Sequence, residues 1–546
     1  MATGIRVIAL AASVSALAFG AFAQGTAQIA AQGAMSPVSG VELSGFTQAI
    51  AEAAASDPAL AGFYAARDYR PIWTSQDDQA RRAALFSALD RSGEQGLPQG
   101  HYDPDGLRAR FAAVQSERQR GLLEVETSKV FLEYAHDVSH GVLDPNRVLS
   151  EIKREPMRAD PQLRLTAFAA SGNPALFLRE LAPQMPQYAQ LLKDKLDLQA
   201  QIAEGGWGDK LPAGKLQPGE QGPAVIALRN RLQKMGYLGR SATARFDGDI
   251  QKAVQSYQAD QGLTPDGVVG ESTREALNTS PEDRMKSVLV ALERLRWMNG
   301  IDFSGRYIWV NIPDFSVRVV DNGKTTFRSV TVVGQSSADR QTPEFSDEME
   351  RMVINPSWHV PRSIVTKEYL PQMQRNPNAA GQLQLIDSRG QVVPRSAVNF
   401  AAYNARNFPF AMKQPPSTRN ALGLVKFLFP NKWNIYLHDT PSKSLFNKES
   451  RAFSHGCVRV GKPFDLAYVL LGAQSPDPKA EFQRILNTGR ETVVPLKQPV
   501  PVHLVYFTAY PTPTGHVEYR RDVYGRDGRI FEALARAGVE LPGSKG

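Results

Sequence analysis

The chain has 546 residues, of which 42% are hydrophobic and 22% are charged, and its formal net charge is +8. This length exceeds what one hydrophobic core supports, so three or more domains are expected. The basic charge fits a carboxylate-bearing partner or a general role in solubility, whereas the lack of any run of five Lys or Arg residues and of an aromatic–basic RNA motif argues against nucleic acid.

Residues 1–23 are typical of a secretory signal peptide. Arg6 precedes an apolar run at residues 7–19, and Ala21-Phe22-Ala23 forms an A-x-A cleavage pattern. The run has 13 residues, which is short for a bilayer. An uncleaved membrane anchor is the alternative, because the segment before the run is only weakly charged. Residues 24–44 are rich in Ala, Gly, Gln and Ser and are predicted to be a flexible leader.

Residues 45–204 are predicted to form an α-helical scaffold domain. Apolar residues recur at helical spacing, as within residues 130–138, and turns such as Asp144-Pro145 separate the helices. His136 and His140 have a zinc-like spacing, but the glutamate of an H-E-x-x-H motif and a third ligand are missing. No metal site is therefore expected.

A compact three-helix unit is predicted at residues 220–279, after a Gly- and Pro-rich linker. Val225, Leu228 and Leu232 share one helix face, and Ser272 with Glu275 is predicted to form a capping box. The unit resembles the peptidoglycan-binding module of cell-wall enzymes, through Gly236-Tyr237-Leu238, Phe246-Asp247, Gln258, Gly262-Leu263, Asp266 to Gly270, and Thr273 to Asn278. That resemblance implies attachment to peptidoglycan.

From about residue 300 the apolar pattern changes to period two, as at residues 308–312, which is typical of β-strands. Asp321-Asn322-Gly323-Lys324 is predicted to form a hairpin turn, because Asn-Gly accepts positive φ angles. A mostly β domain is therefore expected at residues 300–500.

A Gly-, Pro- and Asn-rich excursion at residues 362–424 is predicted to be a partly irregular lid inserted into this domain. Residues 501–546 are predicted to add a C-terminal strand and helix. The expected fold class is thus α+β and multidomain: an α-helical scaffold, a three-helix module and a mostly-β domain with a lid insertion.

Cys457 is the only cysteine in the chain, so it cannot form an intrachain disulfide even though export favours disulfides. It lies in Ser454-His455-Gly456-Cys457-Val458-Arg459, and His438 lies 19 positions upstream. A thiol with a pKa of about 8.5 is mostly protonated at neutral pH, and an imidazole can accept its proton and return it to an amine. Gly456 allows a tight turn that directs backbone amides towards an oxyanion.

His438 together with residues 454–459 resembles the signature of the YkuD-type L,D-transpeptidase catalytic domain. Further similar stretches are residues 354–361, 420–423, 429–432 and 438–441. With the helical scaffold, the peptidoglycan-binding module and the lid, the chain is similar to large Gram-negative murein L,D-transpeptidases over nearly all of its mature length.

The resemblance implies a periplasmic enzyme that transfers acyl groups between peptidoglycan stem peptides. Cys457 would attack the carbonyl of the third residue of a tetrapeptide stem and expel D-alanine. The thioester would then pass to the side-chain amine of a neighbouring stem, giving a 3→3 cross-link. By the same resemblance His438 is the base, the Asp439 carbonyl orients its ring, and the Gly456 and Cys457 amides form the oxyanion hole.

The candidate substrate-binding residues are Arg459, His455, Ser454, Tyr436 and Trp433. Arg459 is expected to pair with a stem carboxylate, and a structural salt bridge is the equal alternative. His455 is expected to shape the pocket. Tyr436 and Trp433 either line the groove or pack within a strand core.

Several alternatives remain open on the sequence alone. Water and amines attack the same thioester, so an L,D-carboxypeptidase, an endopeptidase or an enzyme that attaches an envelope protein to the wall would use the same residues. A non-enzymatic wall-binding scaffold would need only residues 220–279. No cofactor is expected, and the expected partners are stem peptides and a glycosyltransferase or carboxypeptidase, with membrane contact only through an uncleaved leader.

Overall fold

The computed structural model describes residues 44–512 and 516–541. The predicted signal peptide, and the predicted leader apart from Ser44, lie outside the described residues. None of the helices in the described ranges has both the length and the apolar character needed to cross a membrane.

The predicted helical region is confirmed. Its helices are α1 (Gly45–Ala54), α2 (Pro58–Ala65), α3 (Gln79–Asp90), α4 (Pro104–Ala112), α5 (Glu117–His140), α6 (Pro145–Val148), α7 (Pro161–Ala170), α8 (Pro174–Glu180) and α9 (Pro186–Ala203). Six of the nine begin with proline, whose fixed φ suits a first helical position and whose missing N–H leaves no donor unsatisfied there. Trp73 stacks on Phe168 at the centre of this domain, with ring centroids 5.3 Å apart.

The three-helix module is also confirmed, with α10 (Pro223–Lys234), α11 (Gly248–Asp260) and α12 (Glu271–Leu277) around its own apolar core. The predicted Ser272–Glu275 capping box is wrong. The third helix begins at Glu271 with Gly270 as its N-cap, and no side chain caps it. Ser272 therefore lies inside the first turn, two positions after the N-cap Gly270, and cannot act as the N-cap.

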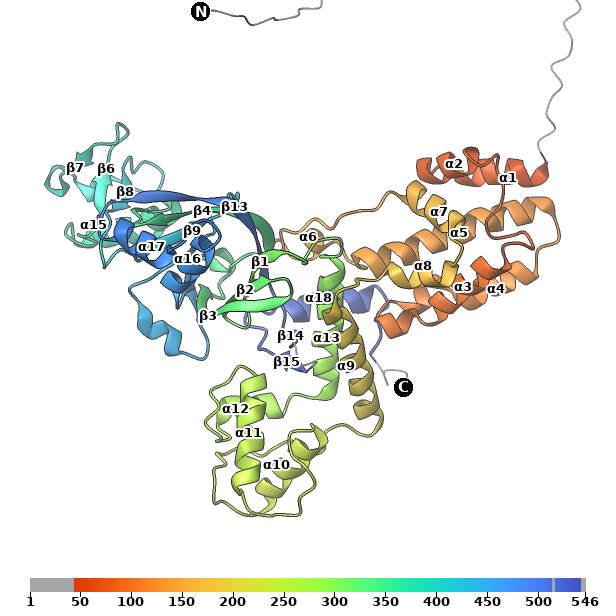
Figure 1. Cartoon of the computed structure of the whole chain (residues 1–546), viewed down its shortest axis with the longest axis horizontal. Helices are drawn as coiled ribbons and strands as arrows, with labels where there is room; N and C mark the ends of the chain where they lie inside the picture. Colours follow the sequence, from red (N-terminus) through yellow and green to blue (C-terminus); the bar gives the residue numbers. More distant parts are fainter. Residues whose placement is uncertain (1–43, 513–515, 542–546) are drawn as a thin grey trace, which may run out of the picture. The chain divides into compact units, whose positions relative to one another are not determined.

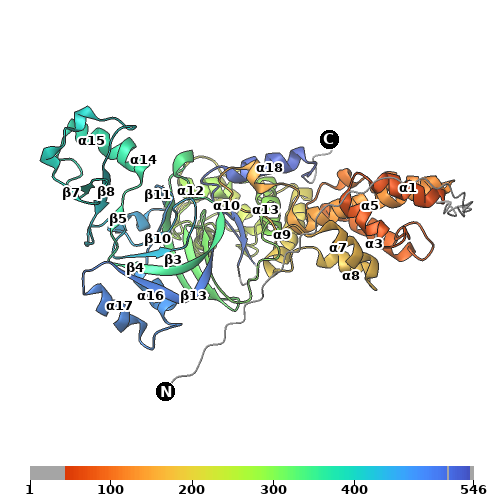
Figure 2. The ribbon, with the colours of Figure 1, turned by 90° about the horizontal axis from the view of Figure 1, so that it is seen from above.

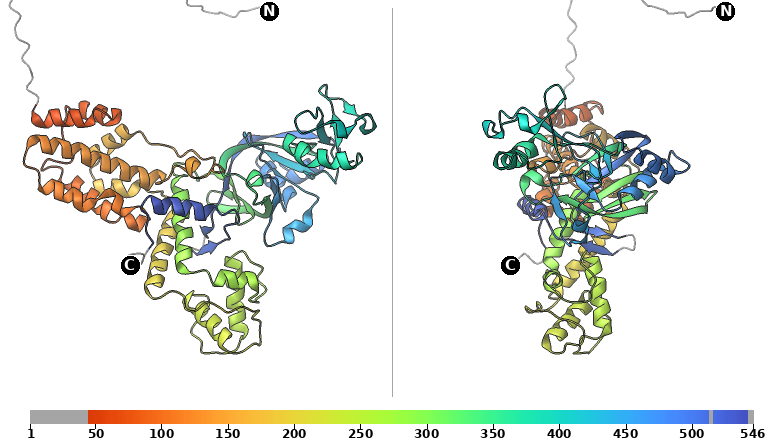
Figure 3. Two further views of the ribbon diagram at one scale, coloured as in Figure 1. Left: turned by 180° about the vertical axis from the view of Figure 1, so that it is seen from behind. Right: turned by 90° about the vertical axis from the view of Figure 1, so that its left-hand side faces the viewer.

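The helix α13 (Pro281–Arg296) links the module to the β domain. It packs along α9 and against the C-terminal helix α18 (Arg526–Arg536), which lies beside α13 in Figure 3. Almost every residue of α13 after its first turn is buried, including Arg294 and Arg296. The helix is therefore a shared core element rather than a linker.

The β domain is built on a nine-stranded sheet in the order β11-β3-β12-β10-β9-β4-β13-β1-β2. Its strands are β1 (Arg306–Asn311), β2 (Ser316–Asp321), β3 (Lys324–Gly334), β4 (Phe345–Ile354), β9 (Val425–Leu428), β10 (Leu437–His438), β11 (Ala452–Ser454), β12 (Val458–Val460) and β13 (Thr492–Val505). Because β2 also pairs with β3, the sheet closes on itself. The helices α16 (Pro463–Leu471) and α17 (Pro478–Leu486) pack on the core of the sheet (Figure 1).

The predicted hairpin between β2 and β3 is confirmed. Asn322 and Gly323 have φ angles of 50° and 77°, the two consecutive positive values that a type I′ turn requires. Strand pairing runs from Asp321–Lys324 back to Ser316–Val330.

The lid insertion is more regular than predicted and has different limits. Its strands β5 (Trp358–His359), β6 (Gln384–Ile386), β7 (Val392–Val393) and β8 (Ala411–Gln414) form a separate four-stranded sheet, accompanied by α14 (Arg362–Ile364) and α15 (Leu370–Arg375). These elements group together in Figure 2 around their own apolar core. The insertion thus spans about residues 358–414 rather than 362–424, and its strands are too short to show a period of two in the sequence.

The predicted boundary at residue 501 is wrong, since it falls inside β13. The strand is continuous from Thr492 to Val505 and pairs with both β4 and β1. Prolines at 495, 499 and 501 suggest a break in the sequence, and the structure accommodates them by a register shift between Pro495 and Val500. The chain then forms the hairpin β14 (Ala509–Pro511) and β15 (Val517–Tyr519) before α18.

Candidate active site

Two short parallel strands, β10 and β12, position the candidate residues. Leu437 pairs with Val458, and His438 pairs with Arg459. Leu437 and Val458 are fully buried in the core of the sheet. Because side chains alternate along a strand, His438 and Arg459 point to the opposite face.

Tyr436 and Cys457 lie two residues before His438 and Arg459, so all four side chains share that face. The face forms the floor of a cavity of about 740 Å³. The sequence-predicted residues that line this cavity are Trp433, Tyr436, His438, Ser454, His455, Cys457 and Arg459. Asp439 and Gly456 do not line the cavity.

The Cys457 thiol is half-buried and held by polar neighbours. Its Sγ lies 3.5 Å from the carbonyl oxygen of Asn434, to which it donates. Desolvation raises the pKa of Cys457 to about 11, although hydrogen bonds from Tyr436 and the charge of Arg459 favour the thiolate. The Cys457 thiol is therefore neutral at physiological pH.

The His438 imidazole is buried and neutral. Its Nδ1 hydrogen-bonds the carbonyl oxygen of Asp439, and because a carbonyl can only accept, Nδ1 carries the proton and Nε2 is the basic nitrogen. Burial and the nearby charge of Arg459 lower the pKa of His438 to about 3, although the carbonyls of Asp439 and Leu422 oppose this shift. Thiol and imidazole are thus both neutral in the resting protein.

This neutral pair predicts how alkylation of Cys457 by iodoacetamide depends on pH. With a thiol pKa of about 11, the thiolate fraction rises about tenfold per pH unit from pH 6 to pH 10, and so should the alkylation rate. An ordinary free cysteine would level off above about pH 9. A fast plateau between pH 5 and pH 8 would instead reveal a thiolate–imidazolium pair and contradict the predicted resting state.

The turn before Cys457 is held by Ser454. Its hydroxyl donates to the Cys457 carbonyl at 2.5 Å and accepts from the Gly456 N–H at 3.1 Å. Gly456 has a φ of +113°, and a Cβ there would lie 3.2 Å from Ile435. The Gly456 amide is thus occupied within the turn, which corrects the expectation that it faces an oxyanion. The glycine provides the turn, and Cys457 N–H has no hydrogen-bond partner in the described part of the chain.

Arg459 faces the cavity without an acidic partner. Among the described residues it forms no salt bridge, so the expected alternative of a structural ion pair is not found, and its Nε is buried without a hydrogen bond. Burial lowers the pKa of Arg459, with the Cys457 sulfur opposing the shift. A buried guanidinium without an acidic partner is suited to bind the carboxylate of a ligand.

Three parts of the chain match known protein families. Residues 305–495 match the family described as "L,D-transpeptidase catalytic domain". This chain carries an L,D-transpeptidase catalytic domain. Residues 221–277 match "Putative peptidoglycan binding domain", and residues 58–194 match "Scaffold domain".

A curated protein of Haemophilus influenzae named "Putative L,D-transpeptidase" is 33% identical over 225 residues, which are 41% of this chain and 45% of that protein. The match thus spans less than half the length of that relative. A solved L,D-transpeptidase from Xylanimonas cellulosilytica is 17% identical and covers 54% of this chain and 99% of its own, with a TM-score of 0.17. One from Stackebrandtia nassauensis is 13% identical and covers 55% and 97%, with a TM-score of 0.21.

Thr342 supports the turn Ser454–Cys457 of the L,D-transpeptidase domain, which is called the catalytic turn below. Its hydroxyl donates to the Gly456 carbonyl oxygen at 2.8 Å and accepts from the Gly334 N–H at 2.9 Å. Thr342 is fully buried. It therefore fixes the peptide between Gly456 and Cys457, and because the peptide is planar and trans, the Cys457 N–H points away from Thr342.

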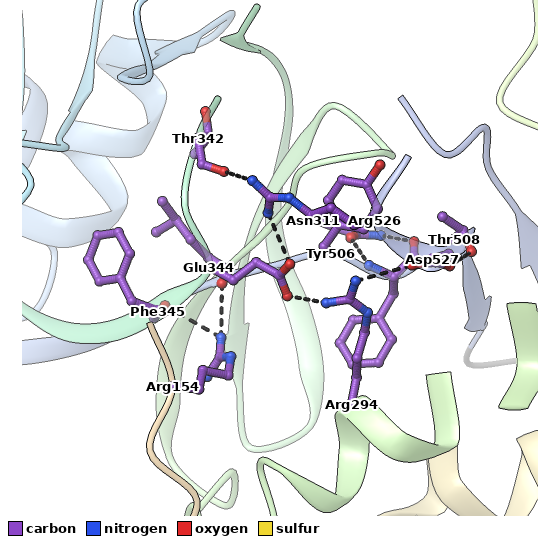
Figure 4. Close-up of polar contacts among 12 residues, drawn as sticks. Arg154, Arg294, Asn311, Thr342, Glu344, Phe345, Tyr506, Thr508, Arg526 and Asp527 are labelled. Atoms are coloured by element: carbon purple, nitrogen blue, oxygen red, sulfur yellow. Dashed lines mark hydrogen bonds and ion pairs between the residues drawn. The ribbon is translucent and has the colours of Figure 1, made fainter. Parts of the chain in front are cut away.

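A buried ionic network extends this support to the C-terminal helix (Figure 4). Arg526 of α18 donates to the Thr342 carbonyl at 2.8 Å and to Glu344 at 2.9 Å. Arg294 of α13 bonds Glu344 and also Asp527, the latter at 3.1 Å. Sequence patterns did not indicate Thr342 or Arg526, because each is more than 65 residues from Cys457 in the chain and neither lies in a local motif.

Replacing Thr342 by valine should lower the rate of Cys457 acylation by a carbapenem about 5- to 20-fold. Valine keeps the volume but leaves the Gly456 carbonyl without its donor. The Cys457 N–H, which is expected to bind the oxyanion, is then less well oriented. Thr342→Ser, which keeps the hydroxyl, should restore the rate. Alkylation by iodoacetamide needs only the thiolate and should change less than twofold. Equal losses in both reactions would mean that Thr342 maintains the fold rather than the amide orientation.

The lid is tied to the catalytic turn through Glu368, which lies in the helical turn Val365–Tyr369 of the insertion. Glu368 Oε1 lies 2.7 Å from His455 Nε2 and 2.7 Å from Arg340 Nη2. The His455 side chain thus forms a hydrogen bond with Glu368 of the lid insertion. Trp433, with 38% of its surface exposed, packs on Phe345 with ring centroids 4.7 Å apart and forms a cavity wall rather than a strand core.

Proposed function

We propose that the protein is a periplasmic peptidoglycan L,D-transpeptidase that forms 3→3 cross-links through a thioester on Cys457. The observation that carries this proposal is the placement of a neutral thiol and a neutral imidazole on one face of β10 and β12, inside one cavity that also holds the unpaired Arg459. The catalytic-domain match and the peptidoglycan-binding match support the same substrate class.

The reaction follows from these groups. Cys457 Sγ bonds to the carbonyl carbon of the third stem residue as its proton passes to His438 Nε2, and the oxygen of that carbonyl becomes an oxyanion near the Cys457 N–H. The C–N bond to D-alanine then breaks, and the imidazolium returns the proton to the leaving amine. A neutral side-chain amine of a second stem attacks the thioester, its proton passes through His438 to the sulfur, and the free thiol is restored.

Arg459 would bind a carboxylate of the donor stem, and Tyr436 would orient the sulfur with the hydrogen bonds described above. Ser454 holds the turn and His455 holds the lid. The peptidoglycan-binding module would keep the domain on the wall, and a carboxypeptidase that shortens pentapeptide stems would supply the donor.

Hydrolysis is the second candidate, because the cavity is wide enough to admit water to the same thioester. Incubation of the full chain with sacculi rich in tetrapeptide stems, followed by mass spectrometry of the muropeptides, separates the two outcomes. New 3→3 dimers are the expected product. Tripeptides without dimers would identify an L,D-carboxypeptidase, loss of existing cross-links an endopeptidase, and unchanged sacculi would contradict the enzymatic proposal.

A further inference from the structure

A second cavity shares Trp433 with the first, and this one has a volume of about 400 Å³. Trp433 lines both cavities, and its neighbour Asn434 contacts the Cys457 sulfur. We propose that this second cavity, the scaffold-side cavity, binds the diamino acid of the acceptor stem before it attacks the thioester. This inference rests on the proposed transpeptidase function, since a hydrolase needs no second peptide site.

The scaffold domain builds one wall of this cavity and is fixed to the catalytic sheet there. The Lys153 N–H donates to the Glu344 carbonyl at 2.7 Å, and the Glu344 N–H donates to the Glu151 carbonyl at 3.0 Å. The buried guanidinium of Arg154 donates to the Leu504 carbonyl of β13 at 2.9 Å. These bonds hold Lys153 and Glu155 at the rim of the transpeptidase domain, so the wall is preformed.

The loop at residues 430–434, which carries Trp433, also lines this cavity. Hydrogen bonds from Asn431 hold this loop. Asn431 Oδ1 accepts from the N–H groups of Trp433 at 3.1 Å and Ile435 at 3.0 Å, and its Nδ2 donates to the Ile435 carbonyl at 2.7 Å. The Asn434 carbonyl that contacts Cys457 lies within this loop. A ligand packed on Trp433 would therefore contact a residue that also lines the cavity of Cys457.

The charges of the scaffold-side cavity suit a zwitterion. Two cations, Lys153 and Lys432, and two carboxylates, Glu155 and Asp347, line it. Within the described ranges none of the four takes part in a salt bridge, although 31 such pairs exist elsewhere in those ranges. The side-chain end of the acceptor carries a carboxylate, which the lysines would bind, and the free amine, which arrives as an ammonium group that the carboxylates attract. After this group loses its extra proton to water, the neutral amine would leave the carboxylates and attack the thioester.

The test separates the two half-reactions. In the double variant Lys153→Ala/Lys432→Ala, acylation of Cys457 by a carbapenem should stay within twofold of wild type, because the donor cavity is untouched. The ratio of 3→3 dimers to tripeptides formed on tetrapeptide sacculi should fall at least fivefold, as water replaces the poorly bound acceptor. Lys479→Ala, an exposed lysine on α17, is the matched control and should leave the ratio unchanged.

An unchanged product ratio in the double variant would overturn the acceptor site. An equal fall in acylation would also overturn it, since the lysines would then serve the donor. Failure of the wild-type protein to acylate or to form dimers would instead refute the proposed function itself, and the two failures are thus distinguishable.

Discussion

Cys457→Ala should abolish the covalent adduct that a carbapenem forms with the protein, and should reduce 3→3 dimer formation by at least on the order of 10³-fold. The chain has no second cysteine that could replace the nucleophile. Intact-protein mass spectrometry after incubation with the carbapenem measures the first effect, and muropeptide analysis measures the second.

The variant should remain folded, because removing one sulfur from a half-buried position costs only about 1 kcal/mol. A thermal melt checks this point. An adduct that persists in folded Cys457→Ala would show that acylation occurs at another residue, and the assignment of the nucleophile would fail.

His438→Gln should lower the acylation rate at pH 7 about 10²- to 10⁴-fold, the usual contribution of a general base. Glutamine fits the buried site and can still donate to the Asp439 carbonyl, but it cannot accept the thiol proton. Stopped-flow acylation with a chromogenic β-lactam measures the effect.

The difference between His438→Gln and wild type should shrink as the pH approaches about 11, where Cys457 ionises without help. At low pH the base remains available in wild type until about pH 3, the pKa of His438. Equal rates for the two proteins at pH 7 would contradict a role for His438 in accepting the proton.

Much of the domain organisation could be predicted from the sequence, because each element has a local signal. The helical spacing before residue 204, the turns of the three-helix module and the Asn322-Gly323 hairpin all depend on neighbours in the chain. Cys457 and His438 were recognisable because a single thiol and its turn form a contiguous motif, and strand pairing then brings them to one face.

The remaining features depend on contacts between distant residues. The four-stranded lid sheet is made of strands of two to four residues, too short for a periodic pattern. The continuity of β13 past Pro499 and Pro501 depends on its pairing with β4 and β1. Thr342 bonds the Gly456 carbonyl, and Arg526 bonds Thr342 because α18 packs on α13, which no local pattern indicates.

The C-terminal helix α18 therefore supports the candidate active site through Thr342, although the family match ends at residue 495. Arg526 and Arg294 are buried and both pair with the buried Glu344, and breaking such a group leaves an uncompensated charge that costs about 3–5 kcal/mol. The support of the catalytic turn and the stability of the domain are thus coupled through α18.

Detection of an acyl group on Cys457 tests the proposed covalent mechanism most directly. The wild-type protein is mixed with a soluble tetrapeptide stem, quenched with acid within one turnover, digested and analysed by mass spectrometry. We predict a tripeptidyl group on the fragment that contains Cys457, with one D-alanine released per acyl group. Release of D-alanine with no acyl group on that fragment, or an acyl group on any other residue, would contradict covalent catalysis by Cys457.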